Sequence, residues 1–240
     1  MLIGKDFPKI EWQPFGLDLV EPNAMIGDTL ILICALFFAY KTARIAQQNV
    51  FFIWWKRFFV LFGISFFMGG IGHLCFNYFG VPGKYASWYL GIVASYCIEM
   101  AMLSLYPYLT TKKHLITTAK IKMGIALTVA TLVFCFVDLT IDPQKGLLVP
   151  TLNSIIGLGL TMGALGYYYS KRISSSFRYL WLSTFILIPS AIVQSLKINI
   201  HPWFDRNDIS HLLLLISLFM YYKCIQGVAR DESTNNSQIA

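Results

Sequence analysis

The sequence predicts an all-α fold, a seven-transmembrane helix bundle, and three observations support this prediction. Of the 240 residues, 56% are hydrophobic and 13% are charged, whereas soluble domains carry about 25% charged residues. Seven apolar stretches each reach the length a helix needs to cross a bilayer, roughly 20 residues. The connections between them are short, so we expect one domain rather than two.

The helices are expected, in order, at residues 25–46, 50–79, 85–109, 115–137, 147–170, 177–199 and 208–229. The first begins near Met25, because the prolines of residues 8–23 argue against a helix before it. Turn-forming or polar residues separate later helices: Pro82 and Gly83, Lys112 to His114, Asp142 to Gly146, Ser170 to Ser176, and His201 to Asp208. Residues 1–24 then form an extracytoplasmic segment, residues 25–230 the membrane domain and residues 231–240 a polar cytoplasmic tail.

The distribution of basic residues predicts how the bundle is oriented. Of the lysines and arginines, 13 fall on one side of the predicted bundle and 6 on the other. The positive-inside rule makes the richer side cytoplasmic, which places the N-terminus outside and the C-terminus inside. The net charge of +7 is therefore interpreted as a topology signal, and no nucleic-acid partner is expected. We expect a multi-pass integral membrane protein whose partner is membrane lipid; the oligomeric state stays open.

Histidines and a carboxylate form the first candidate site. His73 lies near the outer end of the second span, while Asp208 and His211 open the seventh, three residues apart on one helix face. The predicted topology puts all three at a similar depth. Two imidazoles and a carboxylate can bind zinc and leave a position for water. The alternative is a hydrogen-bonded histidine–aspartate network that holds two helices together without a metal.

Glu99 forms the second candidate site, about 20 Å along the third span from its outer start. An ionisable group at this depth is a functional-site hypothesis because it is costly to bury. Its hydrogen-bond partner is expected to be Asn153, Gln194 or a residue of another span. A proton relay and a structural polar clamp both remain open.

The arrangement resembles the alkaline ceramidases of the CREST superfamily, seven-helix membrane metal hydrolases. That family carries Ser-x3-His in span two and His-x3-His in span seven. Here residues 69–73 read Gly-Gly-Ile-Gly-His and residues 207–211 read Asn-Asp-Ile-Ser-His. Glycine thus stands at the serine position and asparagine at one histidine position. The chain is more similar still to uncharacterised bacterial relatives with Gly-Gly-x-x-His and Asn-Asp-x-x-His.

The ceramidases also carry a calcium-binding Asp-x2-Glu-x-Asn just before span one. This chain has Asp18, Glu21 and Asn23 at that spacing, and Asp28, one turn into span one, could complete the set. Hard oxygen ligands of this kind suit calcium. The alternative is an ordinary acidic loop.

The resemblance implies a zinc-dependent hydrolase that cleaves a lipid amide or ester bond. It implies zinc ligands at His73 and His211, with Asp208 as a third ligand or as the general base. Gly69 and Asn207 depart from the family pattern, so a second hypothesis is kept. This is a non-enzymatic sensor or receptor that binds a small ligand or ion in the outer cavity. A proton-coupled transporter that uses Glu99 is the third hypothesis.

Overall fold

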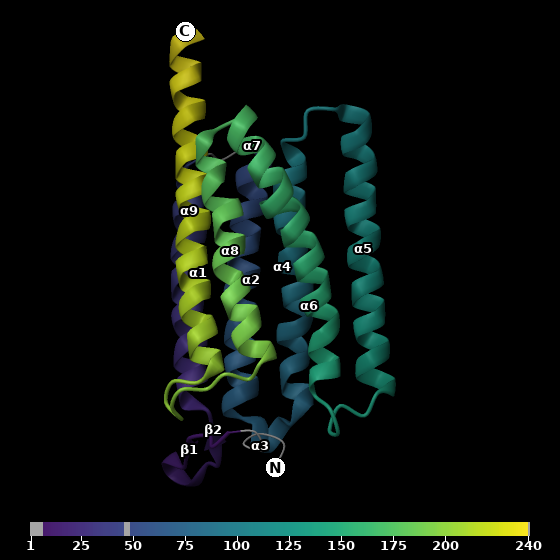
Figure 1. Ribbon diagram of the computed structural model, residues 1–240, viewed down its shortest axis with the longest axis vertical. Helices are drawn as coiled ribbons and strands as arrows, with labels where there is room; N and C mark the ends of the chain where they lie inside the picture. Colours follow the sequence, from purple (N-terminus) through teal and green to yellow (C-terminus); the bar gives the residue numbers. More distant parts are fainter. Residues whose placement is uncertain (1–6, 46–48, 240) are drawn as a thin grey trace.

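In a bilayer, an apolar stretch can satisfy its backbone polar groups internally only as a helix, because lipid offers no hydrogen-bond partners. The computed structural model describes residues 7–45 and 49–239, the side chains of 235–239 excepted, and is almost entirely helical (Figure 1). Within these residues, seven helices are long and apolar enough to cross a membrane. The predicted all-α seven-helix bundle is confirmed. Residues 1–6, 46 and 240, which the predicted segments include, lie outside the described residues.

The helices follow the predicted order with different ends. The long helices are α1 (Pro22–Ile45), α2 (Val50–Leu74), α4 (Tyr85–Ser104), α5 (Leu109–Phe136), α6 (Gln144–Leu158), α8 (Arg178–Ser195) and α9 (Arg206–Ile239). Shorter pieces are α3 (Phe76–Phe79), α7 (Gly166–Arg172), the 3₁₀ turns η2 (Val81–Lys84) and η4 (Ser175–Phe177), and the π-helical segment η3 (Gly159–Leu165).

Most predicted boundaries shift by a few residues, and three differences change the architecture. The second span ends at Leu74 instead of 79, and Gly80, with φ of 57°, turns the chain after α3. The fifth span is one rod in three parts, α6, η3 and α7, because a π-helical segment interrupts it. Residues 231–239, predicted as a polar tail, continue α9 as helix beyond the rest of the bundle (Figure 1).

The segment before α1 forms a short hairpin rather than the expected irregular stretch. Strands β1 (Glu11–Trp12) and β2 (Leu19–Val20) pair antiparallel around the 3₁₀ turn η1 (Pro14–Gly16). Leu19 and Val20 are buried, so the hairpin is fixed against the end of the bundle. It leads directly to Glu21, which precedes α1.

The helices pack in an order that leaves α4 central and α5 at the edge. Helix α1 packs against α2 and α9, α2 against α4, and α4 against α5 and α6, while α8 packs against α9. The hairpin of β1 and β2 and the last turns of α9 lie at opposite ends of the bundle (Figure 1). We refer to these as the N-terminal end and the C-terminal end.

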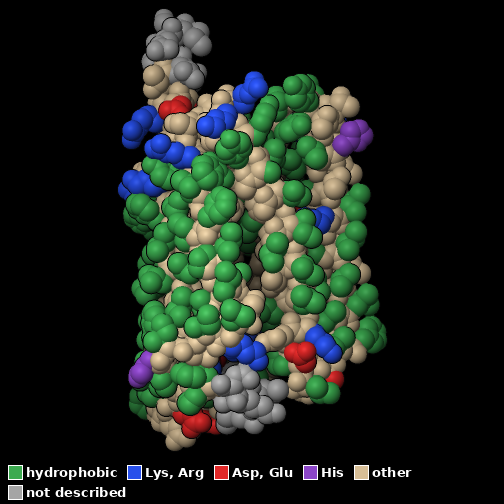
Figure 2. Space-filling model, viewed as in Figure 1, with side chains coloured by type: hydrophobic (Ala, Val, Ile, Leu, Met, Phe, Trp, Pro, Cys, Tyr) green, Lys and Arg blue, Asp and Glu red, His purple; other side chains and the backbone are tan. Residues whose placement is uncertain are grey.

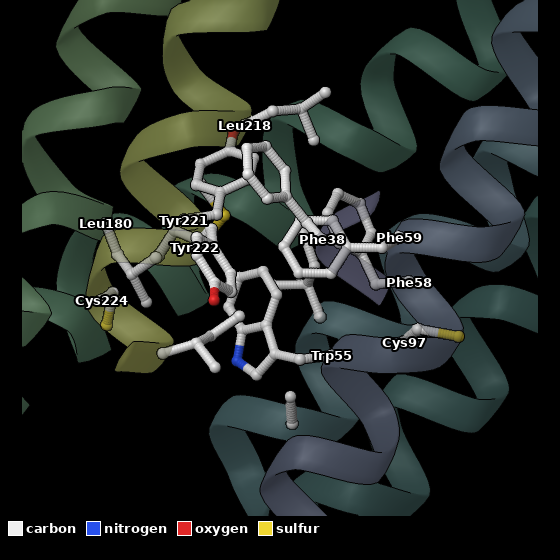
Figure 3. Packing of buried hydrophobic residues seen from close by; sticks show 14 of the residues in the cluster. Phe38, Trp55, Phe58, Phe59, Cys97, Leu180, Leu218, Tyr221, Tyr222 and Cys224 are labelled. Carbon is white, nitrogen blue, oxygen red and sulfur yellow. The ribbon is translucent and has the colours of Figure 1, made fainter. Parts of the chain in front are cut away.

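An aromatic core fills the half of the bundle towards the C-terminal end. Its largest side chains include Phe38 of α1, Trp55 and Phe58 of α2, and Tyr221 and Tyr222 of α9 (Figure 3). The rings of Phe38 and Tyr222 stack with centroids 4.8 Å apart. This core joins α1, α2 and α9 at the C-terminal end. At the N-terminal end, the same three helices meet around a separate, polar region.

The outer surface is apolar along most of the bundle's height. Hydrophobic side chains cover the visible face, and charged side chains lie mainly towards the two ends (Figure 2). Helix α5 illustrates this, because Ile121, Ile125 and Leu132 are each half exposed or more.

Candidate functional site

Charged side chains gather at the N-terminal end around the carboxylate of Glu21. Lys9 Nζ lies 2.5 Å from Glu21 Oε1, and His73 Nδ1 lies 2.5 Å from Glu21 Oε2. Lys9 also pairs with Asp205, in the loop before α9. One lysine thus connects the N-terminal segment to the start of α1 and to the start of α9.

Lys84 adds a second ammonium group from η2. Its Nζ lies 3.3 Å from Nε2 and 3.5 Å from Nδ1 of His73, and 5.6 Å from the ring centroid of Phe76. The imidazole of His73 therefore lies between the Glu21 carboxylate and the Lys84 ammonium group. Since α2 ends at Leu74, His73 is in the last turn of its helix and reaches both.

Asp28 and His211 form a second pair, deeper in the bundle. His211 Nε2 lies 3.1 Å from Asp28 Oδ1, which joins α9 to α1. Two glycines allow this approach. A Cβ at Gly70 would lie 2.9 Å from the Cβ of Asp28, and one at Gly27 would overlap Nδ1 of His211. That Nδ1 is buried and makes no hydrogen bond within the described residues.

Asp208 has the role of a helix-capping residue. It accepts hydrogen bonds from Nδ2 of Asn23 at 2.8 Å and from the backbone N–H of Asp205 at 2.9 Å. Asp208 lies in the first turn of α9, where the positive end of the helix dipole favours a carboxylate. Gln194 also lies here and donates to the backbone of Arg206 at 3.1 Å.

The buried pairs change the acid–base behaviour of the N-terminal segment. Burial alone would raise the pKa of Glu21, but His73 and Lys9 outweigh it, so the net pKa of this carboxyl is well below its ordinary range. Burial alone would lower the pKa of Lys9, but Glu21 and Asp205 outweigh it and raise that pKa. Both groups are therefore stabilised in their charged forms, as an ion pair requires.

The arrangement does not fit one zinc ion shared by His73, His211 and Asp208. The two histidines have separate carboxylate partners, Glu21 for His73 and Asp28 for His211, and Asp208 accepts hydrogen bonds from Asn23 and Asp205. An ammonium group also lies against both nitrogens of His73. Over residues 7–45 and 49–239, no group of three or more His, Cys, Asp or Glu side chains is arranged to hold a metal. The two histidines share an end of the bundle, but each faces a carboxylate of its own.

The predicted calcium ligands also have separate partners. Glu21 pairs with Lys9 and His73, Asn23 donates to Asp208, and Asp28 faces His211. Asp18 contributes its backbone N–H to the hydroxyl of Tyr78, at 2.7 Å. The side chains of Glu21, Asn23 and Asp28 are each oriented towards a cation, an imidazole or a neighbouring helix rather than towards a common centre. These three side chains therefore do not converge on one calcium ion in this arrangement.

Glu99 lies in the middle of the bundle and is paired with Lys122 of α5. Lys122 Nζ lies 2.6 Å from Glu99 Oε1 and donates to Asn153 Oδ1 of α6 at 2.7 Å. Ser95, one turn away on α4, lies 3.5 Å from the same carboxylate oxygen. The partner of Glu99 from another span is thus Lys122, one of the alternatives anticipated, while Asn153 joins the cluster through Lys122 and Gln194 lies at the N-terminal end.

Several residues of these sites were not singled out from the sequence. Lys9, Lys84 and Lys122 counted only as topology signals, and Asp205 was one residue of a polar loop. For Lys122 a signal did exist, because it lies 14 residues into α5, well beyond the reach of a helix end. For Lys9 and Lys84 the sequence carries no such signal, since their contacts depend on how the N-terminal hairpin and the turn η2 fold back onto the bundle.

Fold and site together define a class of protein, a seven-helix bundle suited to span a membrane, with a buried polar network at one end. The chain belongs to a family of unknown function, DUF6962, whose model matches residues 24–230. No curated protein and no solved structure matches the chain.

Proposed function

We propose that this protein is a multi-pass integral membrane protein that acts as a sensor or receptor. It binds a small ligand through an anionic group at the N-terminal end of the bundle. The observation that supports this most is the difference in exposure between the negative and the positive groups of the polar network. Its carboxylates are buried, and its imidazole and ammonium groups lie further out.

The exposed fractions of the side chains give this difference. The side chains of Glu21 and Asp205 are 3% and 1% exposed, whereas those of His73 and Lys9 are 22% and 10% exposed. Lys84 is partly exposed as well. A molecule that arrives at this end therefore meets nitrogen donors before it meets carboxylate oxygens.

Lys84 is the residue that most needs a further partner. Its direct contacts among the described residues are the imidazole of His73 and the face of Phe76, while the carboxylates of Glu21 and Asp28 act on it only through longer-range electrostatics. Ammonium groups form their strongest hydrogen bonds with carboxylate or phosphate oxygens. A charged group at the membrane destabilises the fold unless a partner or a ligand offsets its charge. A ligand anion bound beside Lys84, on the exposed side of His73, would supply a negative charge in direct contact with the ammonium group.

Two kinds of molecule carry an anionic group of this type: lipids, through the phosphate of the headgroup, and soluble phosphates or carboxylates. We place the N-terminal end outside the cell, by the positive-inside rule. Both sources are present at such a membrane surface, so the test must separate them.

The test is equilibrium binding to the purified protein in neutral-lipid nanodiscs, with inorganic phosphate and, separately, with nanodiscs that contain phosphatidylglycerol. Lys84→Met is compared with Lys145→Met, an exposed lysine near the start of α6 at the same end. A charge-assisted hydrogen bond is worth about 1.5–3 kcal/mol, and about 1.4 kcal/mol is tenfold in affinity. We expect Lys84→Met to bind roughly tenfold more weakly and Lys145→Met to bind like the wild type.

Loss of binding only for the lipid, or only for phosphate, identifies the source. Equal affinity of Lys84→Met and wild type for both probes would contradict the proposal. So would an equal loss in Lys145→Met, because that loss would be a general surface-charge effect.

The lipid hydrolase implied by the ceramidase resemblance stays a prediction. It depends on zinc, and the described residues do not fit a shared zinc ion, so we derive no catalytic step for it.

A further inference from the structure

Five basic side chains gather at the C-terminal end of the bundle, opposite the polar network. All five are exposed, and they come from three neighbouring helices: Lys41 and Arg44 of α1, Arg178 of α8, and Lys223 and Arg230 of α9. Basic side chains are grouped at this end over α8 and α9 in the space-filling view (Figure 2). We call these five residues the basic cluster.

Helix α9 packs against both α1 and α8, and its contact with α1 brings two lysines of the basic cluster to similar heights. The rings of Phe38 and Tyr222 stack on each other, so these two residues lie side by side. Lys41 lies three residues beyond Phe38, and Lys223 lies one residue beyond Tyr222. Because α1 and α9 both run towards the C-terminal end (Figure 1), the two lysines differ in height by only about 3 Å of helix rise.

The turn before α8 brings Arg178 to the other side of α9. Ser176 lies so close to α9 that a Cβ at Gly227 would overlap its Oγ. Arg178 follows Ser176 by two residues, and Gly227 lies between Lys223 and Arg230 along α9. The basic cluster is therefore one patch across three helices and not a set of separate surface charges.

The carboxylates near this patch are bonded to neighbouring turns. Asp231 accepts a hydrogen bond from Ser174 Oγ, and Glu232 accepts one from Asn49 Nδ2 at 3.0 Å. Among the side chains that the structure describes, no member of the basic cluster forms an ion pair with a carboxylate. The patch therefore keeps its positive charge.

The lysines of the patch lie against aromatic rings instead of extending into water. Lys41 Nζ lies 5.5 Å from the ring centroid of Phe37, and Lys223 Nζ lies 5.2 Å from that of Phe219. Each ring belongs to the residue four positions earlier in its helix, so it lies one turn closer to the middle of the bundle. The ammonium groups are thus held where the charged surface meets the apolar surface.

The surface that adjoins the basic cluster towards the middle of the bundle is apolar. Phe37 of α1, Phe185 of α8 and Phe219 of α9 are each half exposed or more, and Ile33 and Ile216 continue this surface on α1 and α9. A molecule that fits both parts carries an anionic group joined to long apolar chains. A phospholipid has this form, whereas a soluble anion would leave the apolar part uncovered.

We propose that the basic cluster and the apolar surface beside it form a binding site for an anionic phospholipid at the C-terminal end of the bundle. Clusters of about four to eight basic residues beside a membrane helix recognise anionic headgroups, and each Lys or Arg changes the affinity roughly fivefold. The phosphate faces the cations, and the acyl chains lie along the exposed phenylalanines. This inference does not depend on anion binding at Lys84, which lies at the opposite end.

The test measures lipid binding by native mass spectrometry of the purified full-length protein in a neutral detergent, titrated with phosphatidylglycerol or phosphatidylcholine. Lys41→Gln/Lys223→Gln removes two cations of the basic cluster. Lys113→Gln/Lys120→Gln is the matched control, because it removes two lysines from α5, at the edge of the bundle. All four lysines are exposed, so both double variants should melt at the temperature of the wild type.

We expect the wild type to bind phosphatidylglycerol at least tenfold more tightly than phosphatidylcholine. Its affinity for phosphatidylglycerol should fall at least tenfold in Lys41→Gln/Lys223→Gln and stay within about twofold in the control. Equal losses in the two double variants would overturn the proposal, because the effect would then be one of net charge. So would equal affinity for the two lipids, or displacement of phosphatidylglycerol by inorganic phosphate, which would assign the site to a soluble anion.

Both double variants are also made in Lys84→Met, which removes the anion site of the proposed function. The difference between them should persist in this background, whether or not Lys84→Met itself changes lipid binding. A difference that disappears there would mean that the lipid is bound at the N-terminal end, and it would overturn this inference.

Discussion

At the scale of single residues, glycines decide how closely charged groups approach each other. A Cβ at Gly157 would overlap Oε1 of Glu99 and would lie 2.9 Å from Ser95 Oγ. Gly159, two residues on, has nothing within 4 Å of its Cβ position. The same residue type therefore has opposite roles at neighbouring positions, and sequence alone does not distinguish them.

Gly157→Ala should destabilise the protein, because the new methyl group displaces the Glu99 carboxylate from Lys122. Overpacking of this kind costs about 1–3 kcal/mol. Gly159→Ala should be neutral or stabilising by up to about 1 kcal/mol, since alanine favours helix. Thermal unfolding of both variants in the same detergent checks this. Equal melting temperatures for the two would contradict the packing described here.

The Glu99–Lys122 pair should show strong coupling. Lys122→Met leaves a buried carboxylate without its cation, which costs about 3 kcal/mol or more. Adding Glu99→Gln removes the orphaned charge, so the double variant should be more stable than Lys122→Met alone. Additive losses in a double-mutant cycle, measured by thermal unfolding, would mean that the two side chains do not interact.

Metal content should not depend on the two histidines, because each faces a carboxylate of its own. Mass spectrometry of purified wild type and of the His73→Ala/His211→Ala double variant should find the same amount of zinc in both. Stoichiometric zinc in the wild type, lost in the double variant, would restore the predicted metal site.

At the scale of elements, the N-terminal hairpin is attached to the bundle by an ion-paired lysine. Lys9 joins Glu21 and Asp205, and β2 is buried against the helices. The sequence predicted no helix in residues 8–23, whereas α1 already begins at Pro22 and Pro14–Gly16 form a 3₁₀ turn; the hairpin was not predicted. The two strands are only two residues each, too short for a periodic pattern.

The attachment should weaken in acid. The folded pKa of Glu21 lies below its ordinary value of 4.5, so its stabilising contribution is complete above that pH and decreases as the pH falls below it. Melting temperatures of wild type and Glu21→Gln should therefore differ most near neutral pH, and the difference should shrink steadily as the pH falls below 4.5. A difference that stays constant over this range would contradict the ionic role of Glu21.

The helical elements were largely predictable, and the interruption within one of them was not. Apolar length and turn residues located all seven spans, because a membrane-spanning helix must be long and apolar. The π-helical segment Gly159–Leu165 has no such signature, since it differs from α-helix only by one inserted residue in the hydrogen-bond pattern.

At the scale of the whole molecule, the bundle separates two kinds of interior. The aromatic core fills the half towards the C-terminal end (Figure 3), and the polar network occupies the other end. The sequence predicted that His73, His211 and Asp208 lie at one end, which follows from span order alone. It did not predict their partners, because pairing depends on helix rotation and on loops that return to the bundle.

Seven spans require the two termini to lie on opposite sides of a membrane. Following the positive-inside rule, an epitope tag at the N-terminus should be accessible in intact cells, and one at the C-terminus only after permeabilisation. Protection of both tags, or the reverse pattern, would contradict the orientation used for the proposed function.

The central claim is that Lys84 and His73 hold an anion, and anomalous diffraction from crystals grown with selenate tests it most directly. We predict a selenium peak within hydrogen-bonding distance of Lys84 Nζ, on the exposed side of His73, that is absent from crystals of Lys84→Met. The account would be contradicted if selenium peaks were found only at other sites, or if the same peak were present in crystals of Lys84→Met.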